Sequence, residues 1–223
     1  MSDLLFAPPA LGTVLSLTGL PGGSNKVHDR SPYGNHGTIT GATWVRLPSG
    51  LWVLSFDGSD DCVNCGNGSN LDAVGAITLE AWIRPGLNFT TGVGYQILDK
   101  RNGGIAPTIL WHPTRHLLIY AGDYVAEGKT ASLSSGTWYH VVGIAIDGSA
   151  SNKVYLNAVD DTNTTAVASF VTNTANLVLG ATTDGTNWFN GCIALPRIYR
   201  GYVLTPFEIQ NHFNQEKHLF GVW

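Results

Sequence analysis

Carboxylate side chains are the first candidates for chemistry in this sequence, because hydrolysis of a glycosidic bond uses a pair of them. One carboxyl group protonates the leaving oxygen while the other attacks or activates water. The chain has four glutamates, and none is followed two positions later by an acid. Of the four, Glu80 alone lies in a central strand pattern, and the residues two positions before and after it, Thr78 and Trp82, are not acids. The sequence therefore argues against a glycoside hydrolase.

Two histidine-containing patterns also fall short of a catalytic or metal site. His28, Asp29 and Ser31 are close in sequence, but a catalytic triad is defined by geometry, so a polar turn explains them better. His112 and His116 have a spacing that suits a metal only on a helix. The proline after His112 opposes a helix there. We expect no catalytic residues in this chain.

Three cysteines cannot make a disulfide framework. Cys62 and Cys65 form an isolated C-x-x-C without a second pair, which supports neither a zinc site nor a redox motif. On a strand, positions three apart point to opposite faces. We therefore expect these cysteines to be small buried hydrophobic residues.

The charge and the apolar runs of the chain exclude some classes of binding partner. Charged residues make up 13% of the 223 residues, about half of the ordinary share. The formal net charge is −4 with no basic stripe, which excludes broad attraction to nucleic acid. Asp3, Pro8 and Pro9 interrupt the N-terminal apolar stretch, so it does not read as a signal peptide. No apolar run is long enough for membrane insertion.

The elements that would position any site are mostly strands. From Ala76 to Arg84 and from Thr137 to Asp147, apolar residues alternate with others, which predicts half-buried strands of an antiparallel sheet. Turn signals such as Asp57-Gly58 and Asn190-Gly191 separate many short runs of this kind. We predict one all-β domain over residues 1–223, an antiparallel two-sheet jelly-roll sandwich.

One short C-terminal helix interrupts the strand pattern. Thr205 can cap it, Pro206 suits its first turn, and Glu208 completes a capping box. The helix is predicted from about Pro206 to Asn214. The tail from His218 to Trp223 is apolar enough to return as a last strand.

Several segments in order resemble the laminin-G-like jelly-roll family, within the concanavalin A-like lectin and glucanase superfamily. Each motif is short, but together they cover roughly residues 27 to 210, and the chain also resembles stand-alone members from phage-like or environmental genomes. The motifs are Asp29-Arg30-Ser31-Pro32-Tyr33-Gly34-Asn35-His36-Gly37, Leu54-Ser55-Phe56-Asp57-Gly58-Ser59-Asp60-Asp61, Ile77-Thr78-Leu79-Glu80-Ala81-Trp82-Ile83, Trp138-Tyr139-His140-Val141-Val142, Trp188-Phe189-Asn190-Gly191 and Arg197-Ile198-Tyr199.

The resemblance implies that no cofactor is required and that Ca²⁺ is optional. Calcium needs several oxygen ligands, and the matching turn keeps Asp29 and Asn35 as candidates. The family's late strand commonly carries acids before R-I-Y, whereas this chain has Ala194-Leu195-Pro196, which removes expected ligands. A second acidic cluster, Asp57, Asp60 and Asp61, is explained by a hairpin turn.

The resemblance also implies how such a fold would bind sugar, with an exposed aromatic face and amide or carboxylate partners. The candidates near predicted strand ends and loops are Tyr95, Trp111, Tyr124 and Trp188. Asn187 beside Trp188 makes that loop the best site. Trp82 and Trp138 are expected to pack in the core.

Three functions follow as hypotheses. The first is a non-catalytic binding or adhesion module for a glycan or cell-surface polymer, on an extracellular or virion surface. The second is a structural, self-assembling protein: a virion decoration, capsid or tail component, or a filament subunit. Apolar ends, Leu4 to Leu17 and Leu219 to Trp223, could then reach a homo-oligomer or virion neighbour. The third, a glycoside hydrolase, lacks its carboxylate pair.

Overall fold

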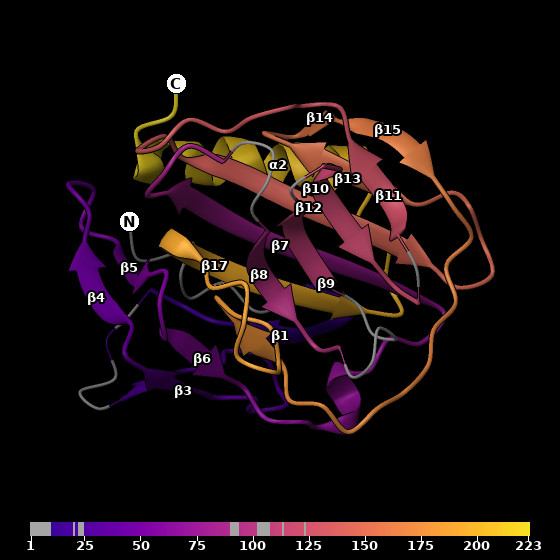
Figure 1. The fold of residues 1–223 in the computed structure, drawn as a ribbon, viewed down its shortest axis with the longest axis horizontal. Helices are drawn as coiled ribbons and strands as arrows, with labels where there is room; N and C mark the ends of the chain where they lie inside the picture. The colour runs from indigo at the N-terminus through magenta and orange to yellow at the C-terminus, as the bar shows by residue number, and fades with distance from the viewer. Residues whose placement is uncertain are drawn as a thin grey trace.

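The alternating apolar residues fold into two antiparallel sheets in a computed structural model, which describes residues 10–19, 21, 25–89, 94–101, 108–112, 114–122 and 124–223. Figure 1 shows β8 and β9 in front of β7 and β17, one sheet over the other. The predicted all-β jelly-roll sandwich is confirmed. Part of the apolar N-terminal stretch, residues 4–9, lies outside the described residues.

Both sheets combine hairpins of consecutive strands with pairings between distant parts of the chain. The eight-stranded sheet runs β14 (Val159–Asp160), β13 (Lys153–Leu156), β12 (Tyr139–Ile146), β7 (Ala76–Pro85), β17 (Asn190–Arg200), β5 (Trp52–Asp57) and β4 (Thr43–Arg46), with β1 (Thr13–Ser16) also on β17. The nine-stranded sheet runs β15 (Thr162–Thr165), β11 (Tyr124–Gly128), β10 (His116–Tyr120), β9 (Thr108–His112), β8 (Tyr95–Asp99), β16 (Val178–Leu179), β6 (Cys62–Asn64), β3 (Gly37–Thr40) and β2 (Lys26–Val27).

The main core lies between the two sheets. On β7, Ile77, Leu79 and Ile83 point into it, as the alternation predicts. The opposite face of β7 is not solvated, however, because Glu80 and Trp82 are also fully buried. The expectation of a half-buried strand is wrong here, since the C-terminal segment covers this outer face.

That covering segment is α2 (Pro206–Glu216) followed by the 3₁₀ helix η2 (Lys217–Phe220). The capping box of Thr205 and Glu208 forms as predicted. The tail is not a strand, because Phe220 stacks on Trp82 with ring centroids 4.3 Å apart and continues the helical path. No helix in the described ranges has the length and apolar character needed to cross a bilayer.

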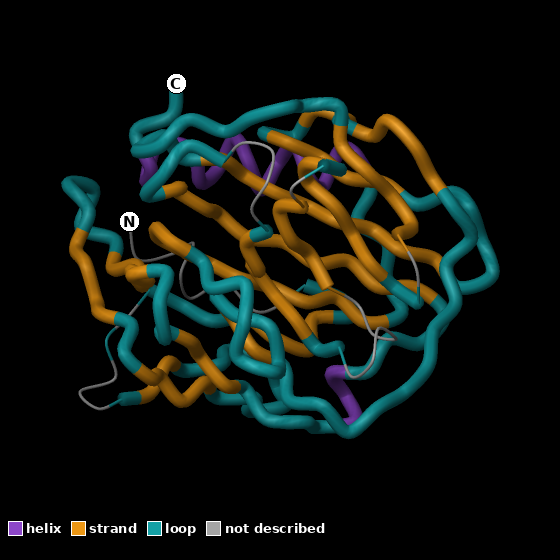
Figure 2. The backbone as a smooth tube through the Cα atoms, viewed as in Figure 1, coloured by secondary structure: helices purple, strands orange, loops and turns teal. Residues whose placement is uncertain are grey.

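Within the described ranges, no helix packs on the outer face of the nine-stranded sheet. Figure 2 shows α2 behind the upper strands and a long loop passing around the edge of the sandwich. This loop, residues 166–177, joins β15 to β16. It ends where β16 joins β8 and β6, so the last turn of the loop lies beside the open sheet face.

Candidate functional site

Strand alternation sets the floor of a groove on the open face. Val63 of β6 and Leu179 of β16 point into the core. Their neighbours Cys62, Asn64 and Val178 therefore point outward. Asn64 and Val178 are paired across the two strands, so their side chains lie side by side.

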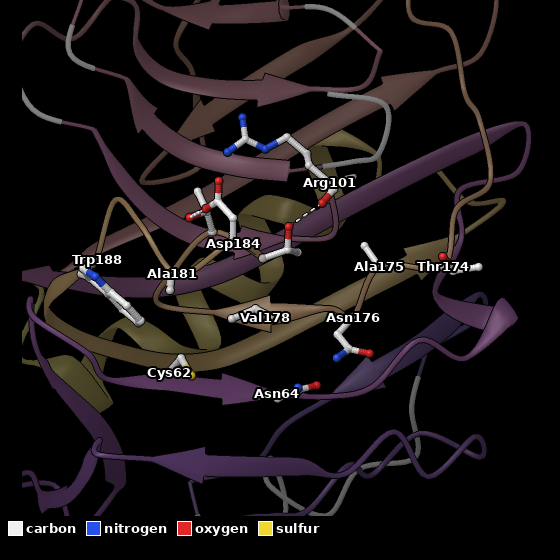
Figure 3. Close-up of a pocket in the computed structure, with 13 residues that line it drawn as sticks. Cys62, Asn64, Arg101, Thr174, Ala175, Asn176, Val178, Ala181, Asp184 and Trp188 are labelled. Atoms are coloured by element: carbon white, nitrogen blue, oxygen red, sulfur yellow. Dashed lines mark hydrogen bonds between the residues drawn. The ribbon is translucent and has the colours of Figure 1, made fainter. Parts of the chain in front are cut away.

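A cavity of about 510 Å³ lies over this floor, which is within the size range of small-molecule sites. Figure 3 shows Trp188 at one end, Asn176 and Thr174 at the other, and Val178 between them. Arg101 and Asp184 lie along one side. We call this cavity the Trp188 groove.

The loop from Ala181 to Trp188 forms one wall, and internal hydrogen bonds hold it in place. The Thr182 hydroxyl donates to Asp184 Oδ1 and accepts the Thr186 amide at 2.7 Å, and the Thr186 hydroxyl donates to the same carboxylate oxygen at 2.9 Å. These hydroxyl groups of Thr182 and Thr186 lower the pKa of Asp184 from its ordinary value. A preformed loop with an ionised carboxylate follows, so little ordering is needed when a ligand binds.

Arg101 supplies the cationic side of the groove. Its Nε donates to Asp99 Oδ1 at 2.8 Å, and its guanidinium carbon lies 5.5 Å from the centre of the Tyr120 ring. These contacts orient the guanidinium group. Together with Asp184, it provides hydrogen-bond donors and acceptors in one cavity.

The structure corrects two of the aromatic candidates. Trp111 is fully buried, and Tyr95 stacks on Phe89 with ring centroids 4.1 Å apart. Both rings pack in the core between the sheets, so they offer no face to an external ligand. The expectation that these two rings are exposed is wrong, because an aromatic residue near a strand end can point either way.

The other candidates have different positions. Trp188 lines the groove, and its binding of sugar stays a prediction. The side chain of Asn187 is exposed, and Asn187 is not among the lining residues; its carbonyl instead accepts the Gln96 amide at 3.1 Å. Tyr124 lies on the outward face of β11 beneath Arg115, whose guanidinium carbon is 4.2 Å from the ring centre. It is likewise not among the lining residues.

Sequence reasoning missed most of the groove. Cys62 and Asn64 could have been found, because they flank a core valine in a strand pattern. Arg101 and Asn176 carry no local signal, since they reach the groove through the pairing of β16 with β8 and β6. Asp184 precedes Gly185, and this pair by itself indicates a turn and no ligand contact.

The two residues predicted to hold calcium, Asp29 and Asn35, make hydrogen bonds within their own turn and to β1. Asp29 Oδ1 accepts the amides of Ser16 and Ser31, and Oδ2 accepts the Ser31 hydroxyl and the Asn35 amide. Asn35 Nδ2 donates to the Val14 carbonyl at 2.8 Å. The carboxylate is thus used to close a turn, and calcium binding here stays a prediction from resemblance.

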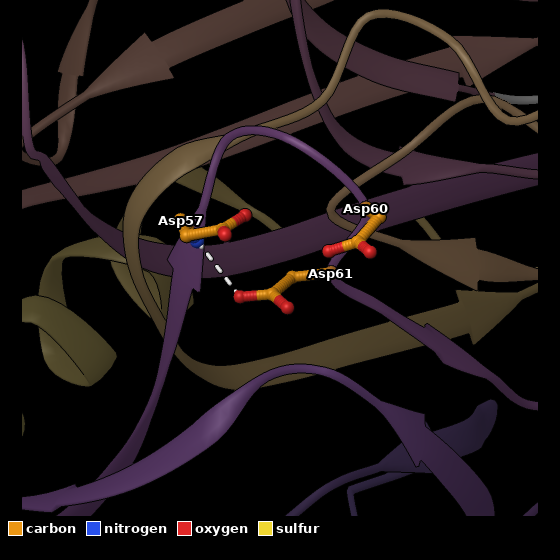
Figure 4. A group of neighbouring side chains, drawn as sticks. All are labelled: Asp57, Asp60 and Asp61. Atoms are coloured by element: carbon orange, nitrogen blue, oxygen red, sulfur yellow. Dashed lines mark hydrogen bonds between the residues drawn. The ribbon is translucent and has the colours of Figure 1, made fainter.

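A second acidic cluster comprises Asp57, Asp60 and Asp61 at the turn between β5 and β6 (Figure 4). Asp61 accepts the Asp57 amide at 2.8 Å, and Asp57 accepts the Ser59 amide at the same distance. Burial, and then the charges of the two other aspartates, raise the pKa of Asp61. A hairpin turn accounts for this cluster.

Glu80, the glutamate on the central strand, lies beneath α2. Its carboxylate is within 3.0 Å of His140 Nε2 and His212 Nδ1, and it accepts the Tyr199 hydroxyl at 2.8 Å. Burial alone would raise the pKa of Glu80, but Arg197 and the histidine bonds hold it well below its ordinary value. The side chain has no exposed surface, so it does not meet an external substrate.

Comparison with known proteins gives one family match. The family model of the concanavalin A-like lectin/glucanases superfamily matches residues 57–210. No curated protein matches the chain.

Solved structures share the fold at low sequence identity. The binding domain of Paraclostridial Mosquitocidal Protein 1 is 15% identical with a TM-score of 0.68, over 95% of this chain and 55% of that one. Trypanosoma rangeli sialidase in complex with sialic acid is 15% identical with a TM-score of 0.64, over 96% and 34%. Botulinum neurotoxin type C is 14% identical with a TM-score of 0.62, over 92% and 51%. The chain thus spans about a third to just over half of the length of the proteins that it matches.

Proposed function

Because the chain belongs to the concanavalin A-like lectin/glucanase superfamily, we propose that it is a carbohydrate-binding module whose ligand occupies the Trp188 groove. The observation that carries this proposal is the lining of the groove. An indole ring lies at one end, and a guanidinium, a carboxylate and amides surround the floor. A sugar presents both apolar and hydroxyl surfaces, which this mixture of groups matches.

Structural relatives support a glycan as the ligand class. The sialidase of similar fold is in complex with sialic acid, and botulinum neurotoxin type C interacts with two ganglioside molecules. Both ligands are sugars or carry them. Fold likeness does not transfer a ligand, so the proposal depends on the groove of this chain.

The proposal is for binding without catalysis. A glycosidase needs two carboxyl groups at the scissile bond. Among the described residues that line the groove, Asp184 is the single acid. The family includes glucanases, so a test of hydrolysis belongs beside the binding test.

We place the module on an extracellular or virion surface, with a glycan or surface polymer as partner. The alternative of a self-assembling structural protein has less support than the sequence suggests. Leu15 and Leu17 are buried in the core of their own chain, as are Leu219 and Phe220 in the cluster beneath η2. Of the final apolar residues, Trp223 is the one that is strongly exposed.

Cys62 is a native reporter for this test, because it lines the groove and is half-buried while Cys65 and Cys192 are buried. The purified chain is screened on a glycan array, and hits are tested for protection of Cys62 from a maleimide. A glycan in the groove should slow labelling of Cys62. Glycan binding with unchanged labelling would show that the ligand lies elsewhere.

Trp188→Ala should weaken glycan affinity at least tenfold, about 1.4 kcal/mol, because aromatic residues dominate such contacts. Trp223→Ala is the matched control, since it removes an indole that is 94% exposed and not among the groove residues. Affinities are measured by calorimetry, and product release from the same glycans is followed by chromatography. Equal loss in both variants, or release of shorter sugars, would overturn the proposal of a non-catalytic groove.

A further inference from the structure

A second cavity of about 540 Å³ adjoins the Trp188 groove. Asn64 and Asn176 line both cavities, so the two lie next to each other with these two side chains at their common border. Its other walls come from β3 and from the turns at Gly34 and at residues 66–68. We call it the amide cavity, after its four asparagines: Asn35, Asn64, Asn67 and Asn176.

Three of these side-chain amides each make one hydrogen bond to a backbone group. Asn35 Nδ2 donates to the Val14 carbonyl, Asn64 Oδ1 accepts the Gly66 amide, and Asn67 Nδ2 donates to the Thr174 carbonyl. In the described part of the chain, the opposite polar atom of each amide has no hydrogen-bond partner. Oriented amides with one open donor or acceptor are pre-organised for a polar ligand.

Strand β3 adds hydroxyl groups to the same cavity. Thr38 is paired with Asn64, and both side chains point outward. Thr38 is exposed, and its hydroxyl has no hydrogen-bond partner among the described residues. It can therefore bond to a ligand without any internal contact being broken.

The two cavities differ in charge. Arg101 and Asp184 line the Trp188 groove, whereas no described Asp, Glu, Lys or Arg lines the amide cavity. Its lining does include His36, whose Nδ1 accepts the Asp29 amide at 3.1 Å. Each cavity is large enough by itself for a small ligand. A ligand that fills both must be longer than one sugar ring and must present neutral polar groups to the amides.

We infer that the chain binds a linear glycan across two subsites, one unit against Trp188 and an uncharged, hydroxyl- or acetamido-bearing unit in the amide cavity. This inference rests on the proposed function and names its ligand class. Each added hydrogen bond tightens binding about fivefold, so affinity rises with chain length until both subsites are filled.

The test uses cello-, chito-, manno- and xylo-oligosaccharides of two and six units, titrated by calorimetry into the full-length chain. For the series that binds, the six-unit chain should bind at least tenfold more tightly than the two-unit chain. Thr38→Val removes a hydroxyl while keeping a β-branched side chain on the strand. It should lower six-unit affinity about fivefold, equivalent to roughly 1 kcal/mol, and leave two-unit affinity unchanged.

Thr43→Val on β4 is the matched control, because Thr43 is exposed and lines neither cavity. The second subsite is overturned if the two-unit and six-unit glycans bind with equal affinity, or if Thr38→Val weakens the binding of both lengths equally. In either case, binding that still depends on Trp188 would uphold the proposed function. If no oligosaccharide of either length protects Cys62, the proposed function fails and this inference fails with it.

Discussion

At the scale of single residues, burial separates side chains that look equivalent in sequence. Trp188 and Trp111 both lie near strand ends, yet Trp188 lines a groove and Trp111 is enclosed in the core. Asp29 and Asp184 are both turn aspartates. Asp29 is buried and accepts four hydrogen bonds, whereas Asp184 faces the cavity. The position of the side chain relative to the core therefore determines its role.

Asp29→Asn should destabilise the fold by about 1.5–3 kcal/mol, because hydrogen bonds to a buried carboxylate are charge-assisted. The free energy of unfolding is measured in urea with Ca²⁺ and with a chelator. Asp60→Asn is the control, since Asp60 is exposed in another turn. We expect the same loss for Asp29→Asn in both conditions. A Ca²⁺-dependent gain in wild-type stability that Asp29→Asn abolishes would restore the calcium prediction.

At the scale of elements, buried ion pairs join α2 to the eight-stranded sheet, with His212 against Glu80 and Glu216 against Arg197. Burial would lower the pKa of His212, but the hydrogen bond and charge of Glu80 outweigh burial and raise it. Glu216 accepts the Trp82 indole N–H at 2.7 Å and pairs with Arg197. The titratable groups that surround His212 are Glu80, His140, Arg197, Tyr199 and Glu216, together with Glu208 one turn earlier on α2.

A raised pKa in the folded state makes the His212 contribution pH-dependent. This stability is fully present below the unfolded histidine pKa, about 6.5, and is lost as pH rises through the folded pKa. We expect the wild-type Tm to fall across that range and His212→Gln to show a flatter profile. His218→Gln on η2 is the control, because His218 is exposed. A His212→Gln profile parallel to wild type would contradict this coupling.

At the scale of the whole molecule, the length of the edge strands determines how readily copies of the chain could pair through their sheets. The described sheets end in β14 and β2, of two residues each, and in β4 and β15, of four residues each. Short edge strands offer few unpaired backbone groups to another chain. The fold thus gives little opportunity for sheet-to-sheet pairing between copies.

A binding module of this kind should be a monomer of 23.8 kDa in solution. Light scattering on the purified full-length chain measures the native mass. A ring or larger closed oligomer would favour the structural-assembly hypothesis. Trp223→Ala would then show whether the exposed C-terminal indole forms the contact, since its loss should return the mass to that of the monomer.

The sequence by itself determined the features that depend on neighbours along the chain. Period-two alternation placed β7 and β12, Thr205 and Glu208 located the start of α2, and the ordered motifs identified the jelly roll. These signals are local, because turns, caps and strand faces are set within a few residues.

Only the tertiary structure decided which surfaces are open and which distant residues meet. Alternation defines two faces of β7, but the packing of α2 made both of them interior. Arg101, Asn176 and Cys62 come together because β16 pairs with both β8 and β6. Such pairings join segments tens of residues apart, and hydrogen bonds between strands carry no residue-specific signal in a single sequence.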